Sequence, residues 1–213
     1  MNHPTFQRPV FKSRVVPVIV ISEVSQAVPM AHALLAGGID VMEITLRHSA
    51  GLAAIEAVAK QVPQMHVGAG TVTRAAEMQQ VHDAGAGFAL SPGMSDALVQ
   101  AAMDCRMPFM PGVMTPSEVM CARDHGFGLM KLFPAAQAGG LAMIKALSGP
   151  LGDVQFCPTG GVTPDNMAAF LQLSNVAMVG GSWLTPADAV AAQDWGRITT
   201  LAKQALACVP ALQ

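Results

Sequence analysis

The chain has 213 residues and a formal net charge of −2, and its few lysines and arginines are scattered, which excludes a surface built for nucleic acid. Hydrophobic residues make up 52% and charged residues 12%, about half the usual charged share of roughly 25%. We therefore expect other copies of the chain to cover part of the surface.

The first predicted strand is the β-branched run 15–21, which contains Pro17 and is far shorter than a membrane span of about 20 residues. Before it, the first 13 residues lack the apolar core of a signal peptide. The segment 24–36 has helical composition and ends at Gly37. We expect no membrane association and no secretion signal.

This strand-then-helix pattern repeats along the chain. Further strand-like runs begin near Val41, Val67, Phe88, Phe109, Leu129, Val154 and Val176. Ser or Thr at a helix start, often with Pro and an acid in the first turn, predicts N-termini for the helices that follow. Such starts occur at Thr73, Ser95, Thr115, Thr163 and Thr185.

Eight β-then-α units, spaced by roughly 20 to 26 residues, predict an α/β fold of the (β/α)8 TIM-barrel type in a single domain. We expect an N-terminal segment at 1–14, the barrel at 15–198 and a helical C-terminal tail at 199–213. The alternative is an open, doubly wound sheet. It would normally carry a Gly-rich turn after the first strand, whereas residues 21–23 contain no glycine.

The cysteines and histidines predict neither disulfides nor metal. Four cysteines lie far apart without a C-x-x-C pair, which indicates free thiols in a reducing cytoplasm. Six histidines are dispersed without H-x-H or H-E-x-x-H spacing.

Lys131 is the most informative residue, because it alone of five lysines lies inside an apolar strand, within the run 128–134. A buried ammonium must find a partner or lose its proton. A neutral lysine attacks carbonyl groups. A purely structural ion pair is the alternative at this point.

The strand 40–47 carries the acid that could serve such a lysine. A period of two places Val41, Glu43, Thr45 and Arg47 on one face, which we expect to line the barrel lumen. The alternative for Glu43 is an ion pair with Arg47 on the same face. An amine, an acid and a guanidinium in one lumen are more than packing requires.

Four predicted strands end in small residues or glycines, which we expect at the rim of the barrel. The third ends in Gly-Ala-Gly at 68–70, before Thr71, and the fourth in Ser-Pro-Gly around Pro92. The seventh and eighth end in Gly-Gly turns at 160–161 and 180–181. Because phosphate sites in such barrels are commonly formed after strands seven and eight, these turns predict a phosphorylated substrate.

Taken together, these motifs resemble one family, the class I 2-keto-3-deoxy-6-phosphogluconate (KDPG) and 4-hydroxy-2-oxoglutarate (KHG) aldolases. The resemblance runs from about Val15 to Ile198, with Leu132 as a departure where the family often has Phe. It rests on Glu-Ile-Thr-Leu-Arg at 43–47, Gly-Ala-Gly-Thr at 68–71, Ser-Pro-Gly at 91–93, Lys-Leu-Phe-Pro at 131–134, Cys-Pro-Thr-Gly-Gly at 157–161 and Gly-Gly-Ser at 180–182.

The resemblance implies cleavage of KDPG to pyruvate and D-glyceraldehyde 3-phosphate, with some activity on 4-hydroxy-2-oxoglutarate. It implies Lys131 as the Schiff-base lysine and Glu43 as the general acid and base. Arg47 and Thr71 would hold the pyruvate carboxylate, and Phe133 would wall the pyruvyl group.

For the rest of the substrate, the resemblance implies that Thr159 contacts the hydroxylated or aldehyde part. It implies phosphate contacts from Gly160, Gly161, Gly181 and Ser182. It further implies no metal or organic cofactor and a homotrimeric assembly.

Two alternatives stay open. Aldolases for the 6-phosphogalactonate epimer are similar but tend to have an aliphatic residue where Thr159 stands, so the gluconate series is favoured. A non-catalytic phosphosugar-binding barrel is disfavoured, because a binding module has no reason to keep a buried amine opposite an acid.

Overall fold

The computed structural model describes residues 9–211. The expected N-terminal segment 1–14 and the expected tail 199–213 therefore lie partly outside the described residues. The strands are β1 (Val15–Ile19), β2 (Val41–Thr45), β3 (His66–Gly70), β4 (Ala89–Leu90), β5 (Phe109–Met110), β6 (Gly112–Val113), β7 (Leu129–Leu132), β8 (Gln155–Pro158) and β9 (Val179–Gly181).

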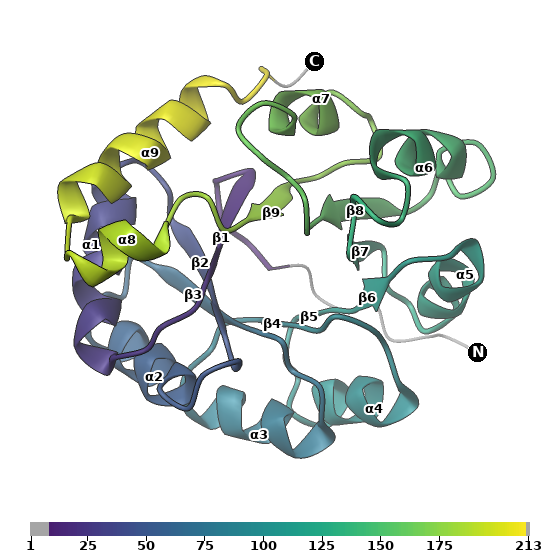
Figure 1. Cartoon of the computed structure of the whole chain (residues 1–213). Coiled ribbons are helices and arrows are strands. Elements are labelled where there is room, and N and C mark those ends of the chain that lie inside the picture. The colour runs from purple at the N-terminus through teal and green to yellow at the C-terminus, as the bar shows by residue number, and fades with distance from the viewer. Residues whose placement is uncertain (1–8, 212–213) are drawn as a thin grey trace.

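The helices are the short 3-10 helix η1 (Val24–Gln26), α1 (Ala27–Ala36), α2 (Gly51–Gln61), α3 (Ala75–Asp83), α4 (Asp96–Asp104), α5 (Pro116–Asp124), α6 (Gly140–Leu147), α7 (Met167–Leu171), α8 (Ala187–Ala191) and α9 (Trp195–Ala207). A helix follows each strand except β5, after which β6 begins one residue later, and two helices, α8 and α9, follow β9. Figure 1 shows the strands at the centre and the helices around them. The structure is thus a parallel α/β fold.

The paired strands run parallel in two sheets. The larger has the order β5-β4-β3-β2-β1-β9 and the smaller β6-β7-β8. Because parallel strands end at the same edge, the residues at their C-terminal ends gather on one side of the molecule. The register places Val18 beside Glu43, and Glu43 beside Gly68.

Hydrogen bonds connect the two sheets at both edges. At one edge only Pro111, which has no N–H to donate, separates β5 from β6. The Met110 carbonyl accepts from the Ser91 N–H at 3.3 Å, and the Pro111 carbonyl accepts from the Lys131 N–H at 2.9 Å. At the other edge, single bridges join Phe156 to 176 and Thr159 to 180.

Two predicted helix starts are confirmed by their capping contacts. The Ser95 hydroxyl accepts from the Leu98 N–H at 3.3 Å at the start of α4. The Thr115 hydroxyl accepts from the Glu118 N–H at 3.3 Å, and the Glu118 carboxylate accepts from the Thr115 N–H at 2.8 Å. This reciprocal pair satisfies N–H groups that have no partner inside the helix.

Three other predicted starts are wrong by one to three residues. Arg74, not Thr73, precedes the first helical residue of α3, and Pro186, not Thr185, precedes that of α8. The largest shift is at α7, which begins at Met167 instead of after Thr163. There the Asn166 side chain accepts from the Thr163 N–H at 2.9 Å and so forms a turn ahead of the helix.

The last helix, α9, has other bounds than the predicted helical tail at 199–213. It begins at Trp195, because the Asp194 carboxylate caps it by accepting from the Arg197 N–H at 2.9 Å, and it ends at Ala207. Thr199 donates from its hydroxyl to the Ala33 carbonyl at 2.9 Å, which fastens α9 to α1. This helix therefore packs onto the body of the fold.

The hydrophobic core lies between the strands and the surrounding helices. On β2, Met42 and Ile44 are fully buried, while Glu43 and Thr45 alternate with them and are buried on the opposite face. Among residues 9–211, no helix combines the length and apolar character needed to cross a membrane.

Candidate active site

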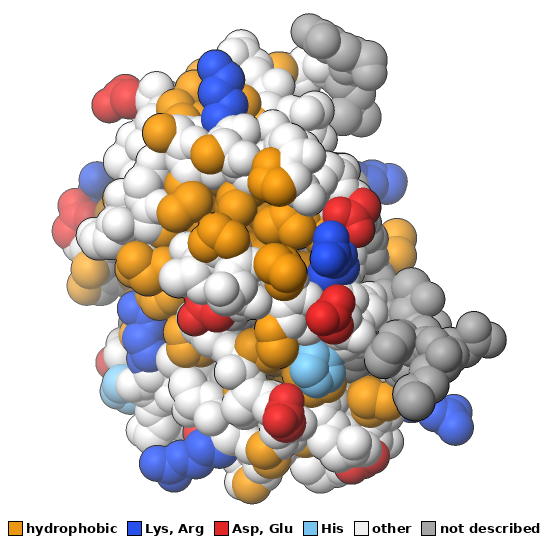
Figure 2. All heavy atoms as spheres, turned by 90° about the vertical axis from the view of Figure 1, so that its right-hand side faces the viewer, with side chains coloured by type: hydrophobic (Ala, Val, Ile, Leu, Met, Phe, Trp, Pro, Cys, Tyr) orange, Lys and Arg blue, Asp and Glu red, His pale blue; other side chains and the backbone are white. Residues whose placement is uncertain are grey.

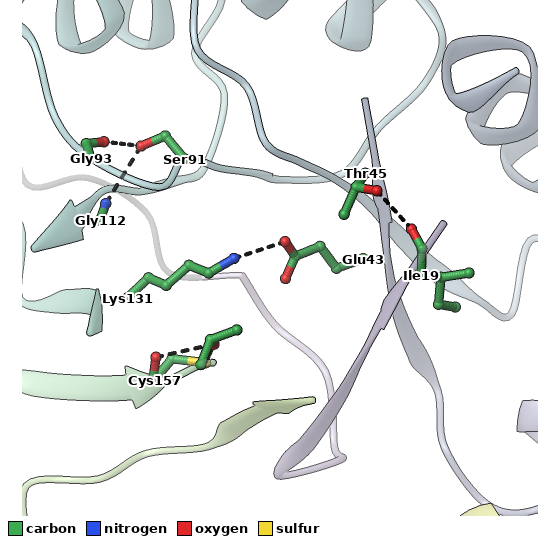
Figure 3. A network of polar contacts seen from close by, with 9 residues as sticks. Ile19, Glu43, Thr45, Ser91, Gly93, Gly112, Lys131 and Cys157 are labelled. Carbon is green, nitrogen blue, oxygen red and sulfur yellow. Dashed lines mark hydrogen bonds and ion pairs between the residues drawn. The ribbon is translucent and has the colours of Figure 1, made fainter. Parts of the chain in front are cut away.

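A buried ion pair joins opposite walls of the strand assembly. Lys131 on β7 donates from Nζ to Oε1 of Glu43 on β2 at 2.9 Å. The lysine side chain is 5% exposed and the glutamate side chain 1%. Figure 3 shows the two side chains meeting between their strands. Each charge thus has its partner where water is largely excluded.

The Glu43 carboxylate keeps one oxygen free. Its Oε2 is buried and has no hydrogen-bond partner among the described residues. Leaving a buried acceptor without a hydrogen bond costs about 1–3 kcal/mol. Such an atom often has a role in binding or catalysis. Glu43 can therefore hold the lysine with one oxygen and exchange a proton through the other.

Gly70 makes room for this carboxylate. A Cβ atom at position 70 would overlap Oε1 of Glu43 and lie 2.6 Å from its Cγ atom. Real Cβ atoms do not approach so closely, so a larger residue would push the carboxylate away from Lys131. The sequence marked this glycine only as part of a small rim, because the close approach arises between two strands.

Cys157 borders Lys131 on the next strand, where the register pairs the two residues. Burial raises the pKa of the Cys157 thiol to about 12, although the Lys131 charge opposes that shift. The thiol is therefore neutral and packs as a small apolar group beside the amine. On the other side Lys131 pairs with Gly112, which has no side chain to crowd it.

Other buried polar side chains near the ion pair form hydrogen bonds with main-chain groups. The buried Thr45 hydroxyl donates to the Ile19 carbonyl at 3.0 Å. Ser91 is also buried; its hydroxyl donates to the Gly93 carbonyl and accepts from the Gly112 N–H at 3.4 Å. Figure 3 shows these contacts around Lys131 and Glu43. Ser91 thereby shapes the turn that presents Pro92, which is exposed.

The residues expected to bind a pyruvate carboxylate lie at the rim. Arg47 is exposed and follows β2 by two residues. The alternative of a Glu43–Arg47 ion pair is not realised, because Glu43 binds Lys131. Thr71 is half-buried with φ of 61°, a left-handed conformation that is unusual for a β-branched residue. Phe133 is half-buried, with its ring centroid 5.5 Å from Lys131 Nζ.

The residues expected to bind the distal part of a substrate follow β8 and β9. Thr159 is buried and donates to the Cys157 carbonyl at 3.4 Å. Gly160 and Gly161 have φ of 91° and 83°, which only glycine adopts readily. Ser182 is exposed directly after β9, whose last residue is Gly181. A bridge between Thr159 and Gly180 places the two Gly-Gly turns on neighbouring segments.

Within the described part of the chain, no three His, Cys, Asp or Glu side chains are grouped so that they could hold an ion.

A parallel α/β fold that holds a buried lysine amine against a carboxylate between its strands defines an enzyme equipped for covalent carbonyl chemistry. The sequence model of a family described as KDPG and KHG aldolase matches residues 7–201. The protein belongs to this family.

Individual relatives agree with that assignment. The chain is 52% identical to a 2-dehydro-3-deoxy-phosphogluconate aldolase of Pseudoalteromonas atlantica over 91% of this chain and 90% of the relative. It is 48% identical to a KHG/KDPG aldolase of Escherichia coli, over 90% of each chain.

Among solved structures, the chain resembles KDPG aldolase from Legionella pneumophila, with a TM-score of 0.88 and 45% identity over 90% of this chain and 93% of that one. That structure holds pyruvate captured at low pH as a covalent carbinolamine intermediate.

Proposed function

We propose that the protein is a class I aldolase that cleaves KDPG to pyruvate and D-glyceraldehyde 3-phosphate. It also cleaves 4-hydroxy-2-oxoglutarate to pyruvate and glyoxylate. The observation that carries the proposal is the buried Lys131–Glu43 hydrogen bond in a member of this family. A lysine beside an acid is the pair that imine formation and carbon–carbon cleavage both require.

The first half of the reaction forms the imine. Transfer of a proton from Nζ to Glu43 along the 2.9 Å contact yields a neutral amine and a neutral acid without creating net charge in the buried site. The Lys131 nitrogen then attacks the C2 ketone and forms a carbinolamine. Glu43 delivers a proton to the leaving hydroxyl, water departs, and the iminium ion remains.

The second half breaks the C3–C4 bond. Glu43, now ionised, removes the C4 hydroxyl proton through a water, and the C3–C4 electron pair moves toward the iminium nitrogen. The aldehyde leaves, and Lys131 holds pyruvate as an enamine. Protonation at C3 and addition of water to the imine release pyruvate and restore the amine. The free Oε2 atom supports this double role for Glu43.

The surrounding residues position the substrate. Arg47 offers a guanidinium fork, which binds a carboxylate with two parallel hydrogen bonds, and Thr71 adds a hydroxyl beside it. Phe133 and Pro92 wall the pyruvyl group. The position of Phe133 near Lys131 Nζ supports this assignment.

The distal part of the substrate extends toward the ends of β8 and β9. Thr159 contacts the hydroxylated carbons, and Gly160, Gly161, Gly181 and Ser182 bind the phosphate. The left-handed glycines support this, because such backbone can turn its N–H groups toward an anion.

The two sheets form one closed eight-stranded barrel and one domain in this proposal. The run 109–113, counted as one strand, and the bridges from β8 to the 176–181 segment support closure. The barrel acts in the cytoplasm, in keeping with cysteines that are free in the described structure.

The chain assembles as a homotrimer in this proposal. Large hydrophobic side chains are exposed on and next to α4 and α5, at Met103, Met114 and Met120. Figure 2, which faces that side of the molecule, shows hydrophobic side chains gathered in one area. A mass in solution of three times 22.1 kDa tests the assembly, and a monomer mass would contradict it.

A product assay tests the activity. Release of pyruvate from KDPG, coupled to lactate dehydrogenase and NADH oxidation, should proceed without added metal and persist after treatment with a chelator. The identity of the second product as D-glyceraldehyde 3-phosphate completes the test. Failure to release pyruvate from either keto acid, in folded protein, would refute the proposed function.

A further inference from the structure

The turn that carries Pro92 is fastened to the strand beside Lys131. Ser91 is fully buried, and its hydroxyl donates to the Gly93 carbonyl and accepts from the Gly112 N–H at 3.4 Å. The Gly112 N–H also donates to the Gly93 carbonyl at 3.3 Å. Figure 3 shows Ser91, Gly93 and Gly112 on one side of Lys131. We call these three hydrogen bonds the Ser91 clasp.

The clasp holds the turn to a segment that is itself hydrogen-bonded to Lys131. Gly112 is the register partner of Lys131 between β6 and β7. One residue earlier, the Pro111 carbonyl accepts from the Lys131 N–H at 2.9 Å. The main chain at 111–112 thus binds Lys131 on one side and the Pro92 turn on the other, which links the positions of these two residues.

Packing supports the turn only from the side of β6. A Cβ atom at position 112 would lie 2.2 Å from the Pro92 carbonyl carbon and 2.5 Å from the Gly93 nitrogen, closer than real Cβ atoms come. The Pro92 peptide therefore rests directly on the backbone of Gly112. At Gly93, a Cβ atom would meet no atom of residues 9–211 within 4 Å beyond its chain neighbours. On that side the Ser91 hydroxyl contacts, and not packing, keep the turn in place.

Ser91 does not reach a substrate itself, because it is fully buried and its hydroxyl donates its one proton to the Gly93 carbonyl. Pro92, in contrast, is exposed, and in the proposed function it walls the pyruvyl group. A wall that is in place before the keto acid arrives does not have to be ordered on binding, and such preorganisation strengthens binding. Ser91 can therefore affect the substrate through Pro92.

We propose that Ser91 is a positioning residue, which holds Pro92 against the pyruvyl group on Lys131, and that Gly112 provides the surface on which the turn rests. The inference rests on the proposed aldolase function. The pyruvyl group is common to KDPG and 4-hydroxy-2-oxoglutarate. The clasp therefore sets the affinity for the part that both substrates share and leaves the preference between them unchanged.

Ser91→Ala removes both hydroxyl contacts and tests the inference. kcat/KM should fall by about fivefold to twentyfold for both keto acids, and the ratio of the two values should stay within about twofold of wild type. The pyruvate concentration that gives half-maximal trapping by borohydride should rise by a similar factor. The trapping rate at saturating pyruvate should be unchanged, because Lys131 and Glu43 keep their contact.

Ser13→Ala is the matched control. Ser13 is also buried, and its hydroxyl likewise donates to a carbonyl and accepts from an N–H, both of Val15, at 2.8 and 3.1 Å. It precedes β1 and so lies at the opposite end of the parallel strands from Pro92. Ser13→Ala should lower the midpoint of thermal unfolding as Ser91→Ala does, but leave the half-saturating pyruvate concentration within about twofold of wild type.

Gly112→Ala is a second, independent variant, because the added Cβ pushes the Pro92 turn from the other side. It should show the same pattern as Ser91→Ala, and it decides the test if Ser91→Ala does not fold. Half-saturating pyruvate equal to that of wild type, or a substrate ratio shifted by more than about twofold, would overturn the role of Ser91 while leaving the aldolase function intact. A wild-type protein that traps no pyruvate would instead overturn the proposed function and this inference with it.

Discussion

The buried centre and the exposed rim of this site are built on different principles. At the centre, Lys131 and Glu43 are almost fully buried and hydrogen-bonded to each other. At the rim, Arg47, Pro92 and Ser182 are exposed, and no described residue forms an ion pair with Arg47. The centre is therefore preorganised by the protein alone, whereas the proposed function has the substrate supply the partners of the rim residues.

The difference predicts where mutations act. A change at the centre disturbs the chemistry itself, because the reacting groups are already in place and surrounded by packed strands. A change at the rim alters which substrate binds and how tightly. The following variants test this division, beginning with the centre.

The largest effect is expected for Lys131→Arg. Arginine keeps the positive charge toward Glu43 but cannot supply a neutral amine. Aldolase kcat should fall by about 10³-fold or more, while thermal unfolding stays close to that of the wild type. Lys145→Arg on α6, an exposed position, is the matched control and should keep full activity. Appreciable turnover by Lys131→Arg would remove Lys131 from its role.

Gly70→Ala should also act at the centre without touching either charged group. The added Cβ would overlap the Glu43 carboxylate and force it away from Lys131. We expect kcat for KDPG cleavage to fall by about 10- to 100-fold, because displacement of a catalytic group misaligns proton transfer.

The matched control is Gly149→Ala, since a Cβ there meets no atom within 4 Å. Pyruvate should still form a reducible adduct with Gly70→Ala, because Lys131 remains. Unchanged kcat in Gly70→Ala would show that Glu43 works from another position.

A smaller effect, on the choice between two substrates, is expected for Thr159, which is buried directly after β8. Thr159→Val keeps the shape of the buried side chain and removes its hydroxyl. It should relax discrimination between KDPG and its galactonate epimer by about tenfold, measured as the ratio of the two kcat/KM values. Thr200→Val, at an exposed position of α9, is the control. An unchanged ratio would exclude Thr159 from the choice of epimer.

The centre could be predicted from the sequence because strands obey simple rules. Lys131 and Glu43 each lie in an apolar strand, and the period of two along a strand predicts which face each side chain occupies. The structure shows that these two faces turn toward each other. The alternation of strands and helices and the caps at Ser95 and Thr115 followed from equally local signals.

The features of the site that could not be predicted from the sequence depend on contacts between distant segments. The choice of Lys131 over Arg47 as partner of Glu43 depends on distances across the strand assembly. The close approach of Gly70 to Glu43 is of the same kind. The start of α7 was misplaced because Asn166 forms a turn that competes with the capping signal at Thr163.

The smallest predicted effect concerns stability at alkaline pH. The pKa of Cys157 is raised by burial to about 12 in the folded protein, above its ordinary value of 9.0. As the pH rises above 9 the unfolded chain loses this proton first, so the thiol's contribution to stability falls. At pH 10 the loss relative to pH 7 is on the order of 1 kcal/mol.

Urea unfolding under reducing conditions at the two pH values measures this loss. Cys157→Ala should show a smaller alkaline loss than wild type by that amount, and Cys208→Ala, which removes an exposed thiol, should not. The absence of tyrosine simplifies the comparison in this pH range. Equal losses in all three proteins would contradict the neutral buried thiol.

The central claim is that Lys131 forms a covalent imine with a keto acid, and reduction with borohydride in the presence of pyruvate tests it most directly. The account predicts a single reduced pyruvyl adduct, located by peptide mass mapping on Lys131 and absent from Lys131→Arg. An adduct on another lysine, or none in a sample shown to be folded, would contradict it.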